Sequence, residues 1–225
     1  MLIPAAGMGE RLGGLEPKAL APLGGKPMLL RTLERFHNAK LSGNIVIIIP
    51  PQHRQAFKNA LAAVVPEVSF LLVDGGAERQ MSVANGLAAL DSDTAIVVIH
   101  DAARPFVTAE SIDASVAAAA RFGAATVAVP AVDTVLVADD EQCLSHTPDR
   151  ATLWVCQTPQ SFQVKIIAEA HQKARRERFI GTDDATLVRR YGGTVRLVMG
   201  SPLNFKVTTP TDLVLAQYIV KEKLA

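Results

Sequence analysis

The chain has few cysteines. Only two of its 225 residues are cysteine, Cys143 and Cys156, and they lack the close spacing of a metal-binding knuckle. We therefore expect both to be free thiols of a cytoplasmic protein, a compartment in which disulfides are rare.

Long apolar runs and a strong net charge are also absent. No run approaches the roughly 20 residues that a helix needs to cross a bilayer, so we expect no membrane span, and the first residues do not have the pattern of a signal peptide. The net charge is +1, which argues against general affinity for nucleic acid or anionic lipid. Any anion site must therefore come from a local arrangement of residues. Hydrophobic residues make up 49% of the chain, enough for a buried core.

Apolar runs alternate with helical patterns over the first half of the chain. The runs at 44–50, 68–74 and 95–100 are short and rich in β-branched residues, which is typical of strands buried on both faces of a parallel sheet. Helices are expected at about 28–39, 54–65, 79–90 and 109–122, and one or two further strands within 125–138. The alternation predicts a Rossmann-like, doubly wound α/β fold with a mostly parallel sheet.

The pattern changes after residue 138. Residues 139–162 are polar and rich in turn formers, and they are too many for a simple loop. We predict a β-hairpin arm, inserted at about 133–160, that projects from the sheet of a single domain spanning 1–225. A long surface excursion without a role is the alternative. Helices are expected again at about 164–178, after Asp183 and from Thr211, with a strand at 194–200.

A glycine-rich segment follows the first short apolar run, in LIPAAGMGERLGGLEPKALAPLGGKPML from residue 2. A dinucleotide fingerprint is disfavoured because Leu12 stands at its third glycine position, and a Walker loop because no Gly-Lys-Ser/Thr follows. Glycines let backbone N–H groups approach phosphate oxygens, and Arg11 and Lys18 add two cations. The combination favours a triphosphate site over a solvated basic loop.

This segment resembles the signature loop of nucleotidyltransferases that join a nucleoside triphosphate to a phosphorylated sugar or polyol. Four further segments resemble the 2-C-methyl-D-erythritol 4-phosphate cytidylyltransferase family of the non-mevalonate isoprenoid pathway. They are GGAERQMSV (75–83), HDAARPFV (100–107), DRATLWVCQTPQSF (149–162) and NFKVTTPTDL (204–213). Ala19 and Ala77 depart from the family pattern, in which glutamine and aspartate are more usual.

The resemblance implies attack by a phosphate monoester on the α-phosphorus of CTP, with diphosphate as the leaving group. A monoester has a second pKa of about 6, so it is mostly dianionic at pH 7 and no general base is needed. Mg²⁺ is the implied cofactor, held mainly by the CTP phosphates, with Asp101 as a candidate ligand. Another polyol phosphate acceptor, such as ribitol 5-phosphate, stays open as the alternative.

The resemblance also implies roles for individual residues. Arg11 and Lys18 are expected to stabilise the transition state and the leaving diphosphate, and Lys206 to lie near the α-phosphate and the acceptor. Arg150 is expected to be catalytic in the site of a second subunit, which it enters from its own chain. This implies a homodimer joined through the arm. The residues expected to bind the nucleotide are Pro4, Ala5, Ala6, Gly7, Gly9, Gly75, Gly76 and Ser82. Those expected to bind the acceptor are Asp101, Thr134, Arg150, Thr182 and Lys206.

Several neighbouring residues have weaker assignments. Arg104 either orders the loop after the strand at 95–100 or closes its turn by an ion pair with Asp101, and His100 is expected to be structural. Glu78 and Arg79 are interpreted as residues of a first helical turn that form a local ion pair. Thr158 either lines the site or fixes the return of the hairpin to the sheet.

Overall fold

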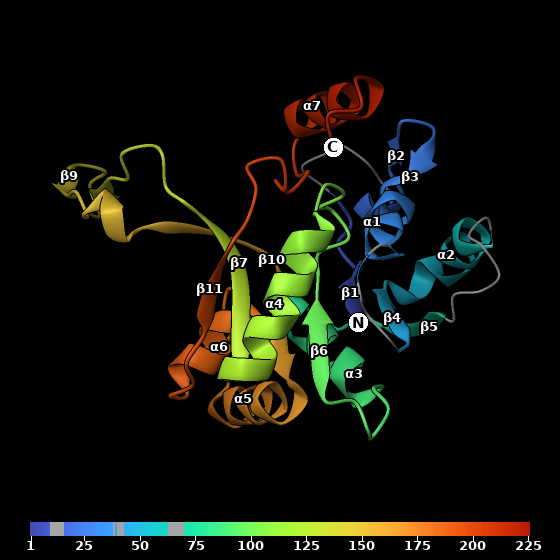
Figure 1. Ribbon diagram of the computed structural model, residues 1–225, viewed down its shortest axis with the longest axis horizontal. Coiled ribbons are helices and arrows are strands. Elements are labelled where there is room, and N and C mark those ends of the chain that lie inside the picture. Colours follow the sequence, from blue (N-terminus) through green and yellow to red (C-terminus); the bar gives the residue numbers. More distant parts are fainter. Residues whose placement is uncertain (10–15, 38, 40–42, 63–69) are drawn as a thin grey trace.

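The computed structural model describes residues 1–9, 16–37, 39, 43–62 and 70–225. Its centre is a seven-stranded sheet with the order β11-β7-β10-β6-β1-β4-β5 (Figure 1). Strand β10 is antiparallel to both of its neighbours, and the other pairings are parallel. The expected mostly parallel sheet is thereby confirmed. Its strands are β1 (Leu2–Pro4), β4 (Ile45–Ile49), β5 (Phe70–Asp74), β6 (Ile96–Ile99), β7 (Ala124–Pro130), β10 (Trp154–Gln163) and β11 (Arg196–Met199).

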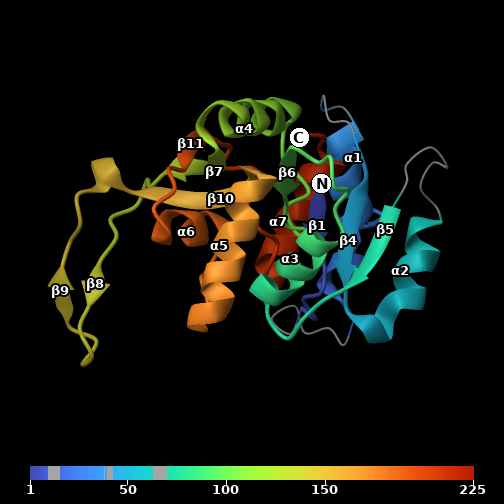
Figure 2. The same ribbon diagram turned by 90° about the horizontal axis from the view of Figure 1, so that it is seen from below.

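Helices cover both faces of this sheet, as a doubly wound fold requires. One hydrophobic core lies between the sheet and α1 (Met28–His37), α2 (Arg54–Leu61) and α4 (Ala109–Phe122). A second core lies on the other face, under α3 (Arg79–Ala88), α5 (Val164–Glu177) and α6 (Asp184–Arg190). Figure 2 shows α4 and α5 on opposite sides of the sheet. Along β6, Val98 belongs to the first core, while Val97 and Ile99 belong to the second.

A third, smaller core lies beside the sheet. It joins α7 (Pro210–Lys221) to Met28, Phe106 and the short strand β2 (Pro22–Leu23), which pairs with β3 (Lys26–Pro27). Helix α7 begins with a capping box, in which the side chains of Thr209 and Asp212 each accept a hydrogen bond from the other residue's backbone N–H. The segment that precedes this helix, residues 204–209, is held beside the loop that follows β6, because the backbone N–H of Val207 donates to the carbonyl of Ala103 at 2.9 Å.

Strand β5 differs from its expected environment. The range 68–74 is predicted to be buried on both faces, but the described part of it is the edge strand of the sheet. Leu71 is 46% exposed, so the prediction of full burial is wrong here. An apolar run by itself does not distinguish an edge strand from a central one.

An arm leaves the sheet between β7 and β10, as expected (Figures 1 and 2). Its hairpin consists of β8 (Val137–Ala138) and β9 (Leu144–His146). The chain rejoins the sheet at Trp154, so the range expected for the insertion, up to residue 160, includes the first part of β10. The sequence of β10 is polar because buried partners satisfy its side chains, as when Ser161 Oγ lies 2.8 Å from Ser115 Oγ.

Candidate active site

A cavity of about 500 Å³ opens beyond the carboxyl ends of β1, β5 and β6. Ligands of open α/β sheets bind at this edge. The described residues that line it are Pro4, Ala5, Ala6, Gly7, Met8, Gly9, Lys18, Ala19, Gly76, Ala77, Glu78, Arg79, Ser82, Asp101, Ala102, Ala103, Lys206 and Thr208.

The glycine-rich segment forms one wall of the cavity. The backbone N–H of Lys18 donates to the carbonyl of Gly7 at 3.1 Å, which brings the two ends of the segment together. Gly9 has a φ of +73°, and a Cβ there would lie 2.9 Å from the Cβ of Lys18. Glycine is therefore required at this position for Lys18 to pack against the turn. Arg11 lies outside the described residues.

Three of the residues expected at the nucleotide, Gly75, Gly76 and Ser82, belong to a tightly packed turn after β5 and to the start of α3. A Cβ on Gly75 would lie 2.7 Å from the Cβ of Ala6, so glycine keeps the two segments in contact, although Gly75 itself is not among the lining residues. The buried hydroxyl of Ser82 accepts a hydrogen bond from Gly76 N at 3.1 Å and donates to the carbonyl of Glu78 at 3.0 Å. Ser82 therefore fixes the shape of the turn.

Three cations surround the buried carboxylate of Asp101. The Nζ of Lys206 lies 2.8 Å from Oδ2, the Nε of Arg104 lies 3.7 Å from Oδ2, and the Nε of Arg79 lies 3.5 Å from Oδ1. Burial opposes ionisation, but Lys206, Arg79 and Arg104 outweigh it and hold the pKa of Asp101 well below its usual range. The carboxylate is thus ionised at neutral pH.

The residues behind Asp101 order the loop. The backbone N–H of Asp101 donates to Oγ1 of Thr158, which lies 3.1 Å from Nδ1 of His100. Burial lowers the pKa of His100 to about 4, so the imidazole is neutral and structural, as expected. Arg104 donates from Nη1 to the carbonyl of Asn204 at 2.8 Å, which connects the loop to the segment that carries Lys206. Thr158 is buried on β10 and is not among the described residues that line the cavity.

Arg79 is a charged lining residue to which the sequence interpretation gave no role at the site. Instead of a local pair with Glu78, its Nη1 donates to Oδ2 of Asp184 at 2.7 Å, and the same side chain contacts Asp101. Burial opposes the charge of Arg79, but Asp184 and Asp101 outweigh it and raise the pKa of its guanidinium. The sequence does carry one signal for this residue. Arg79 stands in the first turn of a helix that follows a parallel strand, which is where open α/β sheets bind ligands.

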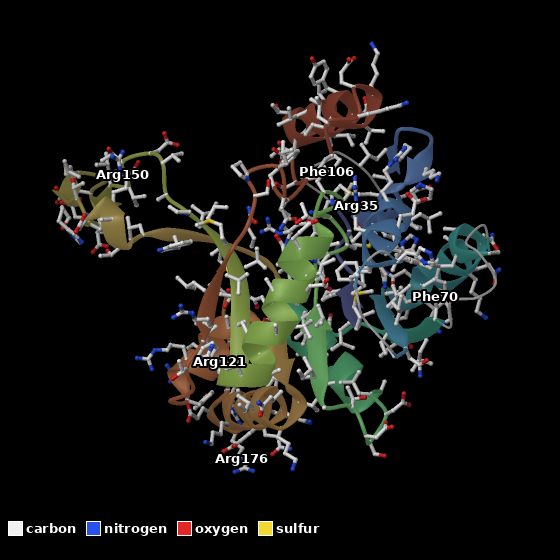
Figure 3. The ribbon with its side chains drawn as sticks, viewed as in Figure 1. Arg35, Phe70, Phe106, Arg121, Arg150 and Arg176 are labelled. Carbon is white, nitrogen blue, oxygen red and sulfur yellow. The ribbon has the colours of Figure 1, made fainter. Side chains whose placement is uncertain are left out.

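Three residues expected at the acceptor do not line the cavity. Thr134 and Arg150 lie on the arm, and Figure 3 shows Arg150 far out on it, beyond the end of the sheet. The Nη1 of Arg150 donates to the carbonyl of Val132 at 2.9 Å, and its side chain is exposed. Thr182 is exposed in the turn before α6. Within one chain, therefore, the structure brings together Lys18, Asp101 and Lys206 but not these three.

The described part of the chain contains no group of three or more acidic, histidine or cysteine side chains placed to hold a metal ion. The carboxylates among the lining residues are those of Glu78 and Asp101. Mg²⁺ keeps much of its water and needs few protein ligands, so these residues fit an ion whose other ligands are phosphates. Cys143 and Cys156 are both free thiols, as expected. Among the residues whose positions are known, no helix has the length and apolarity of a membrane span.

A glycine-rich wall and a cluster of cations at the carboxyl edge of a mostly parallel sheet fit a nucleotidyltransferase. The chain matches the family described as IspD, 2-C-methyl-D-erythritol 4-phosphate cytidylyltransferase, over residues 1–222. It therefore belongs to that family, and the resemblance noted in the sequence is confirmed.

Individual relatives match the chain over at least 98% of its length. The cytidylyltransferase of this name from Geobacter metallireducens is 46% identical, with 99% of this chain and 97% of that protein covered. The one from Caldanaerobacter subterraneus subsp. tengcongensis is 41% identical, with 98% of each covered. The crystal structure of 4-diphosphocytidyl-2C-methyl-D-erythritol synthase from Anaerococcus prevotii superposes with a TM-score of 0.86 at 30% identity, over 98% of this chain and 94% of that one.

Proposed function

We propose that this chain joins CTP and 2-C-methyl-D-erythritol 4-phosphate to give CDP-methylerythritol and diphosphate, a step of isoprenoid precursor synthesis. Family membership over residues 1–222 carries the proposal. The cavity supports it independently, because one wall is glycine-rich and carries Lys18, and another carries Asp101 among cations. No comparison favours ribitol 5-phosphate as the acceptor.

The reaction brings two polyanions together, and the described cations serve that need. Lys18 lines the glycine-rich wall, where it offsets the charge of the triphosphate, and Lys206 lies across the cavity beside Asp101. The acceptor oxygen attacks the α-phosphorus while the bond to the β-phosphate oxygen breaks. Fixed cations stabilise the charge that develops on the α-phosphate in that step. The family match adds Arg11 to this set.

We expect Asp101 to recognise the acceptor. A carboxylate that stays ionised accepts hydrogen bonds from polyol hydroxyls, and it sits beside the cation expected to receive the phosphate. Mg²⁺ would be held by the CTP phosphates and would screen their charge for the attack. Asp101, a carboxylate of the cavity wall, would be the candidate protein ligand of that ion.

The arm supports a homodimer with composite sites. Its side chains Val132, Leu136 and Leu144 are 80%, 60% and 61% exposed, which is unusual for a projecting hairpin without a partner. We expect the arm to pack on a second copy and to place Arg150 and Thr134 in that copy's cavity. The cytoplasmic location expected from the cysteines belongs to the same proposal.

The activity is tested by diphosphate release from CTP and Mg²⁺. Methylerythritol 4-phosphate and ribitol 5-phosphate are parallel acceptors, with UTP in place of CTP as a control. We expect release with CTP and methylerythritol 4-phosphate. Release with ribitol phosphate alone would overturn the acceptor, and release with neither would overturn the reaction.

The composite site is tested by mixing two inactive variants, Lys18→Ala and Arg150→Ala. A mixed dimer contains one cavity with an intact Lys18 that receives Arg150 from the other chain. Random exchange should restore about a quarter of the wild-type sites. If Arg150 acted in the cavity of its own chain, the mixture would stay inactive.

A further inference from the structure

The guanidinium of Arg79 links the cavity to a buried pair of side chains. Its Nη1 donates to Oδ2 of Asp184 at 2.7 Å, and Oδ1 of the same carboxylate lies 3.1 Å from Nε2 of His171. Both of these partners are buried, and neither is a lining residue. The other side of Arg79 faces Asp101. One end of this guanidinium is thus fixed by the protein interior, and the other contacts the wall of the site.

Asp184 is in turn fixed to the central sheet. The backbone N–H groups of Asp184 and Ala185 donate to Oε1 of Gln160 at 3.1 and 3.2 Å. Gln160 is fully buried on β10, paired with Ile99 on one side and Thr126 on the other. The anchor of Arg79 is therefore part of the core, which defines its position far more tightly than a surface loop would.

The two oxygens of Asp101 have different partners. Lys206 and Arg104 both lie on the side of Oδ2, at 2.8 and 3.7 Å. Among the ion pairs of the described residues, the one on Oδ1 is the contact with Arg79 at 3.5 Å. Removing Arg79 would leave both remaining cations on one oxygen, and the carboxylate would be free to rotate toward them.

We propose that Arg79 is a positioning residue, which holds Asp101 in the orientation that binds the hydroxyl groups of the acceptor. The inference rests on the proposed function and deepens its account of the acceptor site. The planar fork of arginine suits this role, since one group can contact two carboxylates in a fixed geometry. Arg79 acts through Asp101 and is not itself assigned to a substrate phosphate.

A double-mutant cycle separates this role from a direct one. Arg79→Gln and Asp101→Asn are made singly and together, and KM and kcat are measured for methylerythritol phosphate and for CTP. Each single variant should raise the KM of the acceptor about tenfold and change that of CTP much less, and the double variant should match the more impaired single one. Losses that multiply in the double variant would overturn the proposal, because Arg79 would then act independently of Asp101.

Loss of Arg79 leaves a buried carboxylate without its cation, so folding is controlled separately. Arg79→Lys keeps a cation beside Asp184 and takes the place of Arg79→Gln in the cycle if the latter does not fold. Asp184→Asn leaves the lining residues Arg79 and Asp101 unchanged. It should nevertheless raise the acceptor KM, as the single variants of those two residues do. An unchanged acceptor KM in folded Asp184→Asn would overturn the anchoring role.

Arg54→Gln is the matched control, because Arg54 pairs with Asp74 at the end of β5 and does not line the cavity. Its acceptor KM should equal that of the wild type, and a rise like that of Arg79→Gln would overturn the assignment. The wild-type chain is assayed first. An inactive wild type would overturn the proposed function, whereas an active wild type with multiplying losses would overturn only the role of Arg79.

Discussion

The ammonium of Lys206 lies 2.8 Å from Oδ2 of Asp101, so two groups assigned to opposite tasks form an ion pair in this structure. Lys206 precedes α7, and Asp101 follows β6. The pairing favours the ionised form of Asp101 before substrates arrive. An acceptor phosphate then has to compete with Asp101 for Lys206, and the polyol hydroxyls have to compete with Lys206 for Asp101. Binding of the acceptor therefore exchanges one set of ionic contacts for another.

Lys206→Ala should lower kcat/KM for the acceptor by about two orders of magnitude or more, because one fixed cation at the developing charge is lost. Steady-state diphosphate release measures this, and calorimetry of CTP binding checks that the nucleotide site is intact. Lys26→Ala is the matched control, since Lys26 forms an exposed pair with Glu34 at 2.6 Å away from the cavity lining. Equal losses in the two variants would contradict a specific role for Lys206.

Gly7→Ala should weaken CTP binding without lowering stability. A Cβ on Gly7 would meet nothing within 4 Å, so the fold accepts it, but it would project where the backbone is expected to approach phosphate. Gly75→Ala should instead lose stability, because its Cβ would lie 2.7 Å from that of Ala6. Thermal unfolding and CTP calorimetry on both variants test the contrast, and wild-type CTP affinity in Gly7→Ala would argue against a phosphate site there.

Much of the fold could be predicted because its signals are local. Helix α4 begins and ends where the pattern predicts, since Thr108 caps its first turn and Gly123 ends it with a φ of +92°. The sequence pattern does not identify β10 as a buried strand, because partners distant in sequence satisfy its polar side chains. Gln160 bonds the backbone N–H of Asp184, and no local pattern reports that contact.

The candidate site could likewise be predicted where its residues stand in local motifs, and not where they depend on contacts between distant parts of the chain. Lys18, Asp101 and Lys206 stand in recognisable motifs, and the structure brings all three to one cavity. The partner of Arg79 could not be predicted, because Asp184 lies in a separate motif and meets Arg79 only when α3 and α6 pack on the same face of the sheet. Arg150 shows a different limit, since in the structure of the single chain it lies on the arm and does not line the cavity.

The neutral, buried His100 should make stability depend on pH. Burial lowers its pKa to about 4, while the unfolded chain has an ordinary histidine with a pKa of about 6.5. The unfolded state therefore binds more protons as the pH falls, and the free energy of unfolding should drop by about 2 kcal/mol between pH 7 and pH 5 from this group. Urea unfolding at the two pH values, on the wild type and His100→Gln, should show a smaller drop in the variant. His146→Gln, at an exposed position on β9, should keep the wild-type drop; equal drops in all three would contradict the assignment.

Charged substitutions on the arm should separate the subunits without unfolding them. Leu136 and Leu144 are 60% and 61% exposed in the single chain, so Leu136→Glu with Leu144→Glu costs the monomer little but places charges in the expected interface. Sedimentation should show dimers for the wild type and monomers for the variant, and the variant should also lose activity.

Trp154 gives a second measurement of subunit separation. It is the single tryptophan of the chain and is 38% exposed at the base of the arm, so its fluorescence emission should move to longer wavelength when the subunits separate. Leu224→Glu, 54% exposed near the end of the chain, is the control and should remain dimeric and active. A wild type that sediments as a fully active monomer would contradict the composite site, because Arg150 would then never reach a cavity.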